Sequence, residues 1–376
     1  MNCCDSEPEP MDVEESNQNI QDNQNSGLDN EKMEKKKKRK VNREKQRESL
    51  VTSGNLFIIT FMKRLQKEKA SKEVTYHYFE RFLHSIFFFG HINIPPITPN
   101  EFLPDEKIDQ FTKIVPKAFK EYNTHLPHYT PYSIFLEYMT ECLKPEDPNL
   151  FLKKLAVFNE SLWKVTDEEG NQPIANDFTL TASVVTYCCS KDSRDAKVLK
   201  KAYGSSMSCK GKVQRQIMIA ISALHVWDKA ISYAVCCAGT GLPITFPDQV
   251  HCNAYKLKTQ KGEYEEIDPC TKCNQMYIVK SSSKYQAQNR KEDWLFGNCA
   301  ENESFSRLLQ SDISVREKIC IIGENGETLM NWEDIQSKFK EKYEDVKKKE
   351  VKNLLSSRGF KLGSGEWKFF IPSYAL

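Results

Sequence analysis

The 376-residue sequence lacks the long apolar runs that membrane-spanning helices need. No run of about 18 or more residues is free of polar side chains, so a membrane protein is not expected. Residues 1–10 are acidic and polar, without the basic start and apolar centre of a secretory signal. We therefore expect an intracellular protein, in which the 13 cysteines are core residues, metal ligands or reactive thiols rather than disulfides.

Large apolar side chains are almost absent from residues 1–31, which are rich in Glu, Asp, Asn, Gln and Ser. Such a composition cannot offset the entropy of ordering the chain, so residues 1–52 are predicted to form a disordered arm. The acidic part of the arm gives way to a run of cations, Lys35, Lys36, Lys37, Lys38, Arg39 and Lys40. This run resembles a nuclear import signal, which predicts nuclear localisation and an import receptor as partner.

Histidine is scarce, and its seven copies are scattered rather than spaced as metal ligands. Residues 53–169 instead carry apolar and aromatic side chains at helical spacing, separated by joints that contain proline. They predict a mainly helical domain in which the aromatic side chains serve packing.

Residues 170–318 are predicted to form an α/β core. Residues 178–187 are rich in β-branched side chains, which is typical of a strand or of a buried helix. An apolar stripe over residues 217–235 predicts one helix. Residues 250–258 and 264–267 predict two short strands joined by a turn, which lead to the first of two cysteine motifs.

The first motif is Pro269-Cys270-Thr271-Lys272-Cys273. Asp268 can cap a helix and Pro269 suits its first position, so Cys270 and Cys273 would lie one turn apart on one face. A helix start favours the thiolate, which is the form that binds a metal.

The second motif, Cys299-Ala300-Glu301, is predicted to begin another helix after a strand at residues 293–296 and a turn. It adds a third thiol and a carboxylate. Three thiolates can hold zinc and leave a position for water, while a carboxylate that is not a ligand can move protons.

A proline followed by Cys-x-x-Cys, paired with a helix-start Cys-Ala-Glu, resembles the zinc-dependent nucleoside and nucleobase deaminase superfamily. The resemblance implies that Cys270, Cys273 and Cys299 bind zinc and that Glu301 is the catalytic proton shuttle. It also implies hydrolytic deamination, in which water attacks the amine-bearing carbon of a base and ammonia leaves. The likeness covers residues 250–309. Its two motifs stand in the reverse of the family's usual order, so either the core is permuted or the match is partial.

A rival assignment restores the usual order by taking His251-Cys252-Asn253 as the first motif. It puts an amide where the carboxylate should be, and an amide cannot accept and return a proton, so this version is an inactive zinc protein. His251 and Cys252 therefore remain alternative ligands, which could also close the tetrahedron into a purely structural site.

The C-terminal residues 319–376 offer a different class of function. Two amphipathic helices followed by a hairpin at residues 359–370 resemble a winged-helix module. It carries cations suited to phosphate contacts, namely Lys347, Lys348, Lys349, Lys352, Arg358, Lys361 and Lys368. The same elements could also simply close the preceding domain.

Together these patterns predict a helix-rich α/β protein. It has a disordered arm (1–52), a helical region (53–169), a deaminase-like zinc-binding core (170–318) and a winged-helix-like module (319–376). The predicted function is hydrolytic deamination of a nucleobase or nucleotide, which could lie within nucleic acid. The alternative is a non-catalytic, zinc-stabilised nuclear protein that binds nucleic acid or a protein partner.

Overall fold

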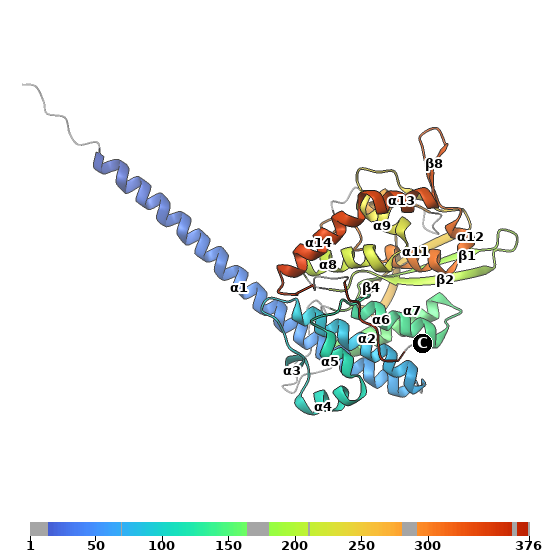
Figure 1. Cartoon of the computed structure of the whole chain (residues 1–376), viewed down its shortest axis with the longest axis horizontal. Helices are drawn as coiled ribbons and strands as arrows, with labels where there is room; N and C mark the ends of the chain where they lie inside the picture. Colours follow the sequence, from blue (N-terminus) through green and yellow to red (C-terminus); the bar gives the residue numbers. More distant parts are fainter. Residues whose placement is uncertain are drawn as a thin grey trace, which may run out of the picture. The chain divides into compact units, whose positions relative to one another are not determined.

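A computed structural model describes residues 14–68, 70–163, 180–209, 211–279, 292–362 and 367–374. The chain divides into two units, Met1–Glu48 and Ser49–Leu376. The second unit is a mixed, helix-rich α/β fold with two small sheets (Figure 1). Among the described residues, no helix is both long and apolar enough to cross a membrane.

The described part of the first unit, residues 14–48, is helical and belongs to α1 (Glu14–Lys67). We expected residues 1–52 to lack regular structure, and the structure differs from residue 14 onward. The segment is rich in Glu, Gln, Lys and Arg, which have high helix propensity, and no proline interrupts it. The predicted import signal therefore lies in helical backbone, and residues 1–13 fall outside the described residues.

A layer of helices opens the second unit and carries its aromatic core. It consists of α1 from residue 49, α2 (Lys72–His91), α3 (Pro99–Phe102), α4 (Asp105–Ile114), α5 (Pro116–Glu121), α6 (Pro131–Leu143) and α7 (Pro148–Trp163). Phe57 and Phe61 of α1 each pack on Phe82 of α2, with ring centroids 4.7 Å apart in both pairs. Phe135 of α6 packs against the same two α1 rings, so the aromatic side chains do serve packing.

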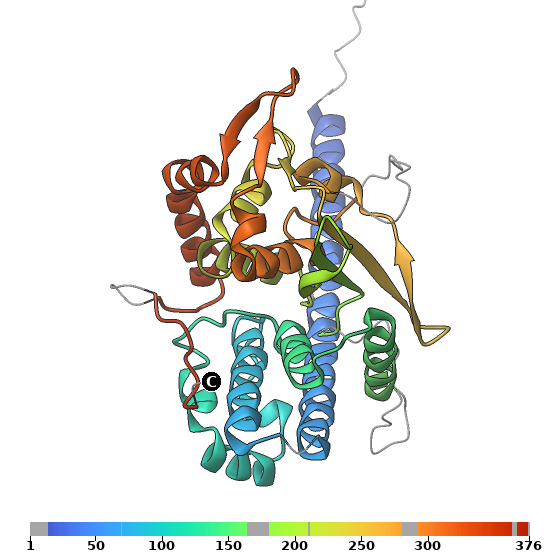
Figure 2. The same ribbon diagram turned by 90° about the vertical axis from the view of Figure 1, so that its right-hand side faces the viewer.

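An antiparallel sheet of order β2-β1-β4-β5 covers these helices. Its strands are β1 (Val184–Lys191), β2 (Val198–Ser205), β4 (Val250–Lys258) and β5 (Glu263–Ile267). Side chains of one face, such as Val185 and Tyr203, join the aromatic core. Side chains of the other face, such as Cys188 and Ala202, join a second core together with residues of α9 and α11. Figures 1 and 2 show helices on both sides of this sheet.

One helix was predicted over residues 217–235, and the structure has two. α8 (Lys212–Ile221) runs into a π-helical turn at Ser222–Val226, and α9 (Lys229–Cys237) begins after a break at Trp227. The cause is Asp228, whose carboxylate accepts a hydrogen bond from the Ala230 N–H at 2.9 Å and caps α9.

A second sheet of order β6-β3-β7-β8 brings together short strands from distant parts of the sequence. They are β3 (Ile244–Thr245), β6 (Tyr277–Ile278), β7 (Cys320–Ile322) and β8 (Thr328–Asn331). The short helices α10 (Thr271–Met276) and α12 (Ile313–Arg316) and the longer α11 (Ala300–Ser311) lie along the chain between them.

The C-terminal helices close the fold. α13 (Trp332–Lys342) packs on α9, and α14 (Glu344–Ser356) packs on α8. Residues 359–362 and 367–370, predicted as parts of a hairpin, form no strand pair with each other, and residues 363–366 lie outside the described residues. Phe369 instead forms an isolated bridge with Leu126. This arrangement matches the alternative in which these elements close the preceding domain.

Helix α11 lies very close to the sheet at Gly204 of β2. A Cβ atom at this position would be 2.4 Å from the Ala300 carbonyl oxygen and 2.5 Å from the Ser304 amide nitrogen. Ser304 also exchanges hydrogen bonds with Thr186 at 2.8 Å and with the Cys188 thiol at 3.0 Å. The absence of a side chain at Gly204 thus sets where α11 begins.

Replacing Gly204 with alanine should push α11 off the sheet, because the obstructing atoms are backbone and cannot rotate away. We expect the free energy of unfolding to fall by about 3 kcal/mol, measured by urea denaturation followed by circular dichroism.

The matched control is Gly326→Ala. Gly326 has a φ of 84°, and no atom of the described residues lies within 4 Å of the place that a methyl group would occupy, so alanine there adds only backbone strain. Gly326→Ala should lower the free energy of unfolding by about 1 kcal/mol. Equal losses in the two variants would show that α11 does not depend on the close approach.

His84 of α2 is a buried titratable group. Its ring stacks on Phe370 with centroids 3.9 Å apart. Burial lowers its pKa from 6.5 to about 3. The folded protein therefore holds this imidazole neutral.

Between pH 6.5 and about 3 the unfolded chain binds a proton at His84 that the folded chain does not. The free energy of unfolding should therefore fall as the pH is lowered through this window, by on the order of 1 kcal/mol per pH unit. His84→Phe keeps a ring on Phe370 and should remove this component from the pH dependence of urea denaturation. An identical pH slope in both proteins would contradict the assignment.

Candidate metal centre

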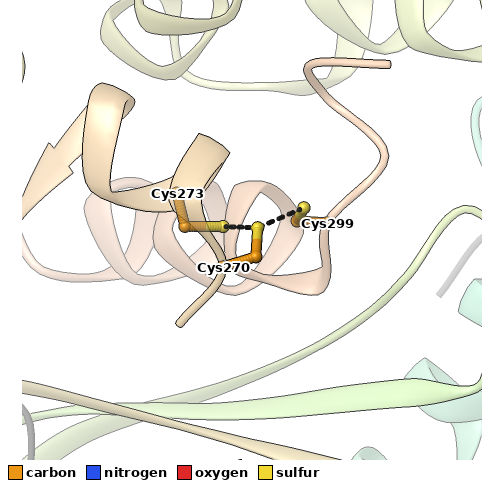
Figure 3. Close-up of side chains that lie close together, drawn as sticks. All are labelled: Cys270, Cys273 and Cys299. Carbon is orange, nitrogen blue, oxygen red and sulfur yellow. Dashed lines mark hydrogen bonds between the residues drawn. The ribbon is translucent and has the colours of Figure 1, made fainter. Parts of the chain in front are cut away.

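Three cysteines from two helix starts lie together. Cys270 is the N-cap of α10, Cys273 lies in its first turn, and Cys299 is the N-cap of α11. The Cys270 sulfur lies 3.5 Å from that of Cys273 and 3.4 Å from that of Cys299 (Figure 3). All three sulfur atoms lie within 4.8 Å of one another.

This donor set fits a zinc ion. Zinc binds thiolates at about 2.3 Å in a tetrahedron, which places its sulfur ligands about 3.8 Å apart. The observed spacings are slightly shorter and need only small side-chain adjustments. Among the described residues the group contains three ligand atoms, so a tetrahedral ion would keep a fourth position open.

The three thiols influence one another through their hydrogen bonds. Hydrogen bonds with the thiols of Cys273 and Cys299, together with backbone N–H groups at the start of α10, lower the pKa of Cys270. The hydrogen bonds with Cys270 and burial raise the pKa values of Cys273 and Cys299 well above the ordinary range. Cys270 is therefore the most readily ionised of the three thiols, and a metal ion would displace the protons that remain on the cluster.

Glu301 lies beside the sulfur atoms in the first turn of α11. It is 6% exposed. Burial is the main cause that raises its pKa to about 7, and the charge of Cys270 adds to it. A carboxyl group with a pKa near neutrality can both accept and return a proton.

A small cavity of about 10 Å³ adjoins this carboxylate, and its walls include Cys252, Cys273, Tyr277, Glu301 and Phe305. That volume is about the size of one water molecule. The site can thus hold a single small polar molecule between a sulfur ligand and the carboxylate.

Two features that the sequence analysis missed hold the first motif. Glu292 accepts hydrogen bonds from the backbone N–H groups of Thr271 and Lys272, at 2.9 and 3.2 Å, and so caps α10. We predicted that Asp268 would do this. The Lys272 ammonium group also donates to the Trp294 carbonyl oxygen. Residues 293–296, predicted as a strand, are therefore an irregular segment held against α10.

The second motif is held by Asn302, which also went unnoticed. Its side chain donates a hydrogen bond to the Cys299 carbonyl oxygen at 2.8 Å and accepts one from the Tyr277 hydroxyl at 2.6 Å. Tyr277 belongs to β6, directly after α10. This side chain thereby ties the two cysteine helices together. An asparagine after Cys-Ala-Glu carries no spacing signal that could have indicated its role.

The alternative ligands lie outside the cluster. Cys252 of β4 is buried opposite Cys188 of β1, and their sulfur atoms are 2.6 Å apart. His251 precedes it on the strand, so its side chain points to the other face of the sheet. Neither belongs to the group of ligand atoms that the structure brings together.

The predicted nucleic-acid contacts lie mostly on and after α14. Lys347 forms an ion pair with Glu350 at 2.6 Å, and Lys348 forms one with Glu344 at 2.8 Å. Lys349 and Lys352 are exposed on the same helix, and Arg358, Lys361 and Lys368 follow it. In the predicted import signal, Lys37 and Lys40 are exposed.

Searches with this chain against protein families, curated proteins and solved structures found no match. Its function is therefore inferred from the residues of the site.

If the three cysteines form one site, the purified protein should contain about one zinc ion per chain, measured by inductively coupled plasma mass spectrometry. Cys270→Ser, Cys273→Ser and Cys299→Ser should each lose it, because two remaining thiolates hold zinc far more weakly.

Cys320→Ser is the control, since Cys320 is half-buried in β7 and lies outside the cluster. It should retain the metal. A wild-type protein without zinc, or zinc that survives in Cys299→Ser, would contradict a site shared by both motifs.

Proposed function

We propose that this protein is a zinc-dependent hydrolase that removes the amine of a nucleobase or nucleotide. The observation that carries the proposal is the position of Glu301, a buried carboxyl group that lines the same small cavity as Cys273 and does not belong to the group of cysteine ligands. A site that only stabilised the fold would gain nothing from a carboxyl group buried at this cost.

Each residue has a distinct role in this proposal. Cys270, Cys273 and Cys299 would hold the ion, because their sulfur atoms converge and the pKa of Cys270 is lowered. The bound ion would lower the pKa of a neighbouring water and make a nucleophile available at neutral pH. Glu301 would accept the proton of that water and deliver it to the departing amine.

The substrate class follows from the resemblance of the two motifs to the nucleoside and nucleobase deaminases. The reversed order of the motifs in the sequence does not prevent their residues from meeting, since α10 and α11 begin beside each other (Figure 3). Support for the proposal thus comes from a spatial arrangement that does not depend on the order of the segments.

We also propose that the protein acts in the nucleus. The cations at Lys35–Lys40 are the basis for an import receptor as partner, and the exposed cations Lys349 and Lys352 of α14 are the basis for contact with nucleic acid.

One observation favours the second candidate, a zinc-stabilised protein without turnover. The cavity beside Glu301 measures about 10 Å³, which admits a water molecule but no base. Catalysis would require its walls to move apart when the substrate binds, whereas a structural site would not. Activity of a Glu301 variant distinguishes the two.

Glu301→Gln keeps the size of the side chain but cannot take up a proton. We expect ammonia release from bases, nucleosides or single-stranded nucleic acid to fall at least about 1,000-fold, as for loss of a general acid–base group. Zinc content should stay the same. The free energy of unfolding should not decrease, because a neutral amide avoids the burial of a charge.

Glu317→Gln is the control, because Glu317 is an exposed carboxylate outside the site. It should keep full activity. If zinc-loaded wild-type protein releases no ammonia from any of these substrates, the non-catalytic candidate holds and the deaminase proposal fails.

A further inference from the structure

A second, larger cavity lies away from the cysteine cluster, on the other side of α11. Its volume is about 620 Å³, within the usual range for small-molecule sites. It is bounded by α2, α6, the edge strand β2 and α11. Arg307 of α11 faces it, whereas Glu301 lies six residues earlier on the side of the helix that faces the cysteines.

A buried ionic network forms one wall. Glu137 of α6 accepts hydrogen bonds from Arg81 at 2.6 and 3.2 Å and from Arg307 at 3.2 Å. Arg307 also donates to Glu303 at 2.8 Å. Both guanidinium groups lie over the ring of Tyr129, at 5.8 and 5.0 Å from its centroid. The network fixes two cations at the cavity.

The two carboxylates that line this cavity already accept hydrogen bonds from other residues. Glu137 is bound by two arginines, and Glu141 accepts a hydrogen bond from the Tyr78 hydroxyl. Two hydrogen-bond donors of the cavity residues, in contrast, lack a partner. Within the described part of the chain, Arg307 Nε and the Tyr203 hydroxyl are buried without a hydrogen-bond partner, and both residues line the cavity. Orphan buried groups of this kind call for a partner such as an ion.

Two lysines and a strand edge add further donors. Lys144 and Lys201 line the cavity, and the Lys201 ammonium, which carries three protons, donates a hydrogen bond to the Pro145 carbonyl. β2 is the edge strand of its sheet, and the Ser205 N–H donates outward, to Glu303 at 3.1 Å. The alternation of an antiparallel ladder places the Tyr203 N–H on the same open edge.

We propose that this cavity binds a small molecule that carries a phosphate or carboxylate group. Four cationic side chains, Arg81, Arg307, Lys144 and Lys201, line this cavity, together with the carboxylates of Glu137 and Glu141, which already accept hydrogen bonds. Oxyanions accept several such bonds at once, and arginine matches their geometry. This site lies beyond the proposed deaminase function and does not depend on it.

The test is isothermal titration calorimetry on the full chain with pyrophosphate, inorganic phosphate and citrate as probes. We expect saturable binding of at least one of them. Lys201→Ala should weaken it on the order of tenfold and Tyr203→Phe by a few-fold, as for loss of hydrogen bonds to a charged ligand. Tighter binding of the phosphates than of citrate would identify a phosphorylated ligand, and the reverse order a carboxylate.

The chain provides a matched control for each variant. Lys200 is exposed next to Lys201 but does not line the cavity, and Tyr187 lies directly opposite Tyr203 on β1 and does not line it either. Lys200→Ala and Tyr187→Phe should bind the probe as wild type does. Circular dichroism checks that each variant is folded. No saturable binding to wild type, or equal effects of Lys200→Ala and Lys201→Ala, would overturn the proposal.

Discussion

The close contact between α11 and the sheet at Gly204 is the constraint on which the rest of the molecule depends. It brings the Ala300 carbonyl and the Ser304 amide against a strand that has no side chain there, which places the start of α11 over the sheet. Residues on one side of this helix then reach the start of α10, and residues on the opposite side reach α6 and the edge of β2. Because of this contact, the cysteine cluster and the cationic cavity lie on opposite sides of α11.

The residues of the candidate site could be named from the sequence because their chemistry is local. Proline, paired cysteines and a helix start occur within a few residues of each other, and Cys299 caps α11 as the pattern predicted. The supporting residues could not be named. Glu292 and Asn302 act through contacts with segments about 20 residues or more away, at Thr271 and Tyr277. Neither spacing nor composition contains that information.

For the fold, too, the sequence predicted elements with a clear local pattern and missed those that depend on other features. The strands at Val250–Lys258 and residues 264–267 are present because alternation and a turn specify a hairpin. The stripe from residue 217 to 235 was misread as one helix because apolar periodicity continues across Trp227, while the capping of α9 by Asp228 does not change that periodicity. The helix over residues 14–52 depends on helix propensity, which the composition argument for disorder ignored.

The hydrogen bonds among the three thiols have a consequence for metal uptake. The pKa values of Cys273 and Cys299 are raised while that of Cys270 is lowered, so an incoming ion gains its thiolate ligands by displacing thiol protons. Loading is then a competition between the metal ion and the thiol protons. Below the pKa values of those two thiols, metal affinity would therefore rise with pH. Acidification would therefore weaken metal binding through the thiols themselves, before any ligand leaves its place in the fold.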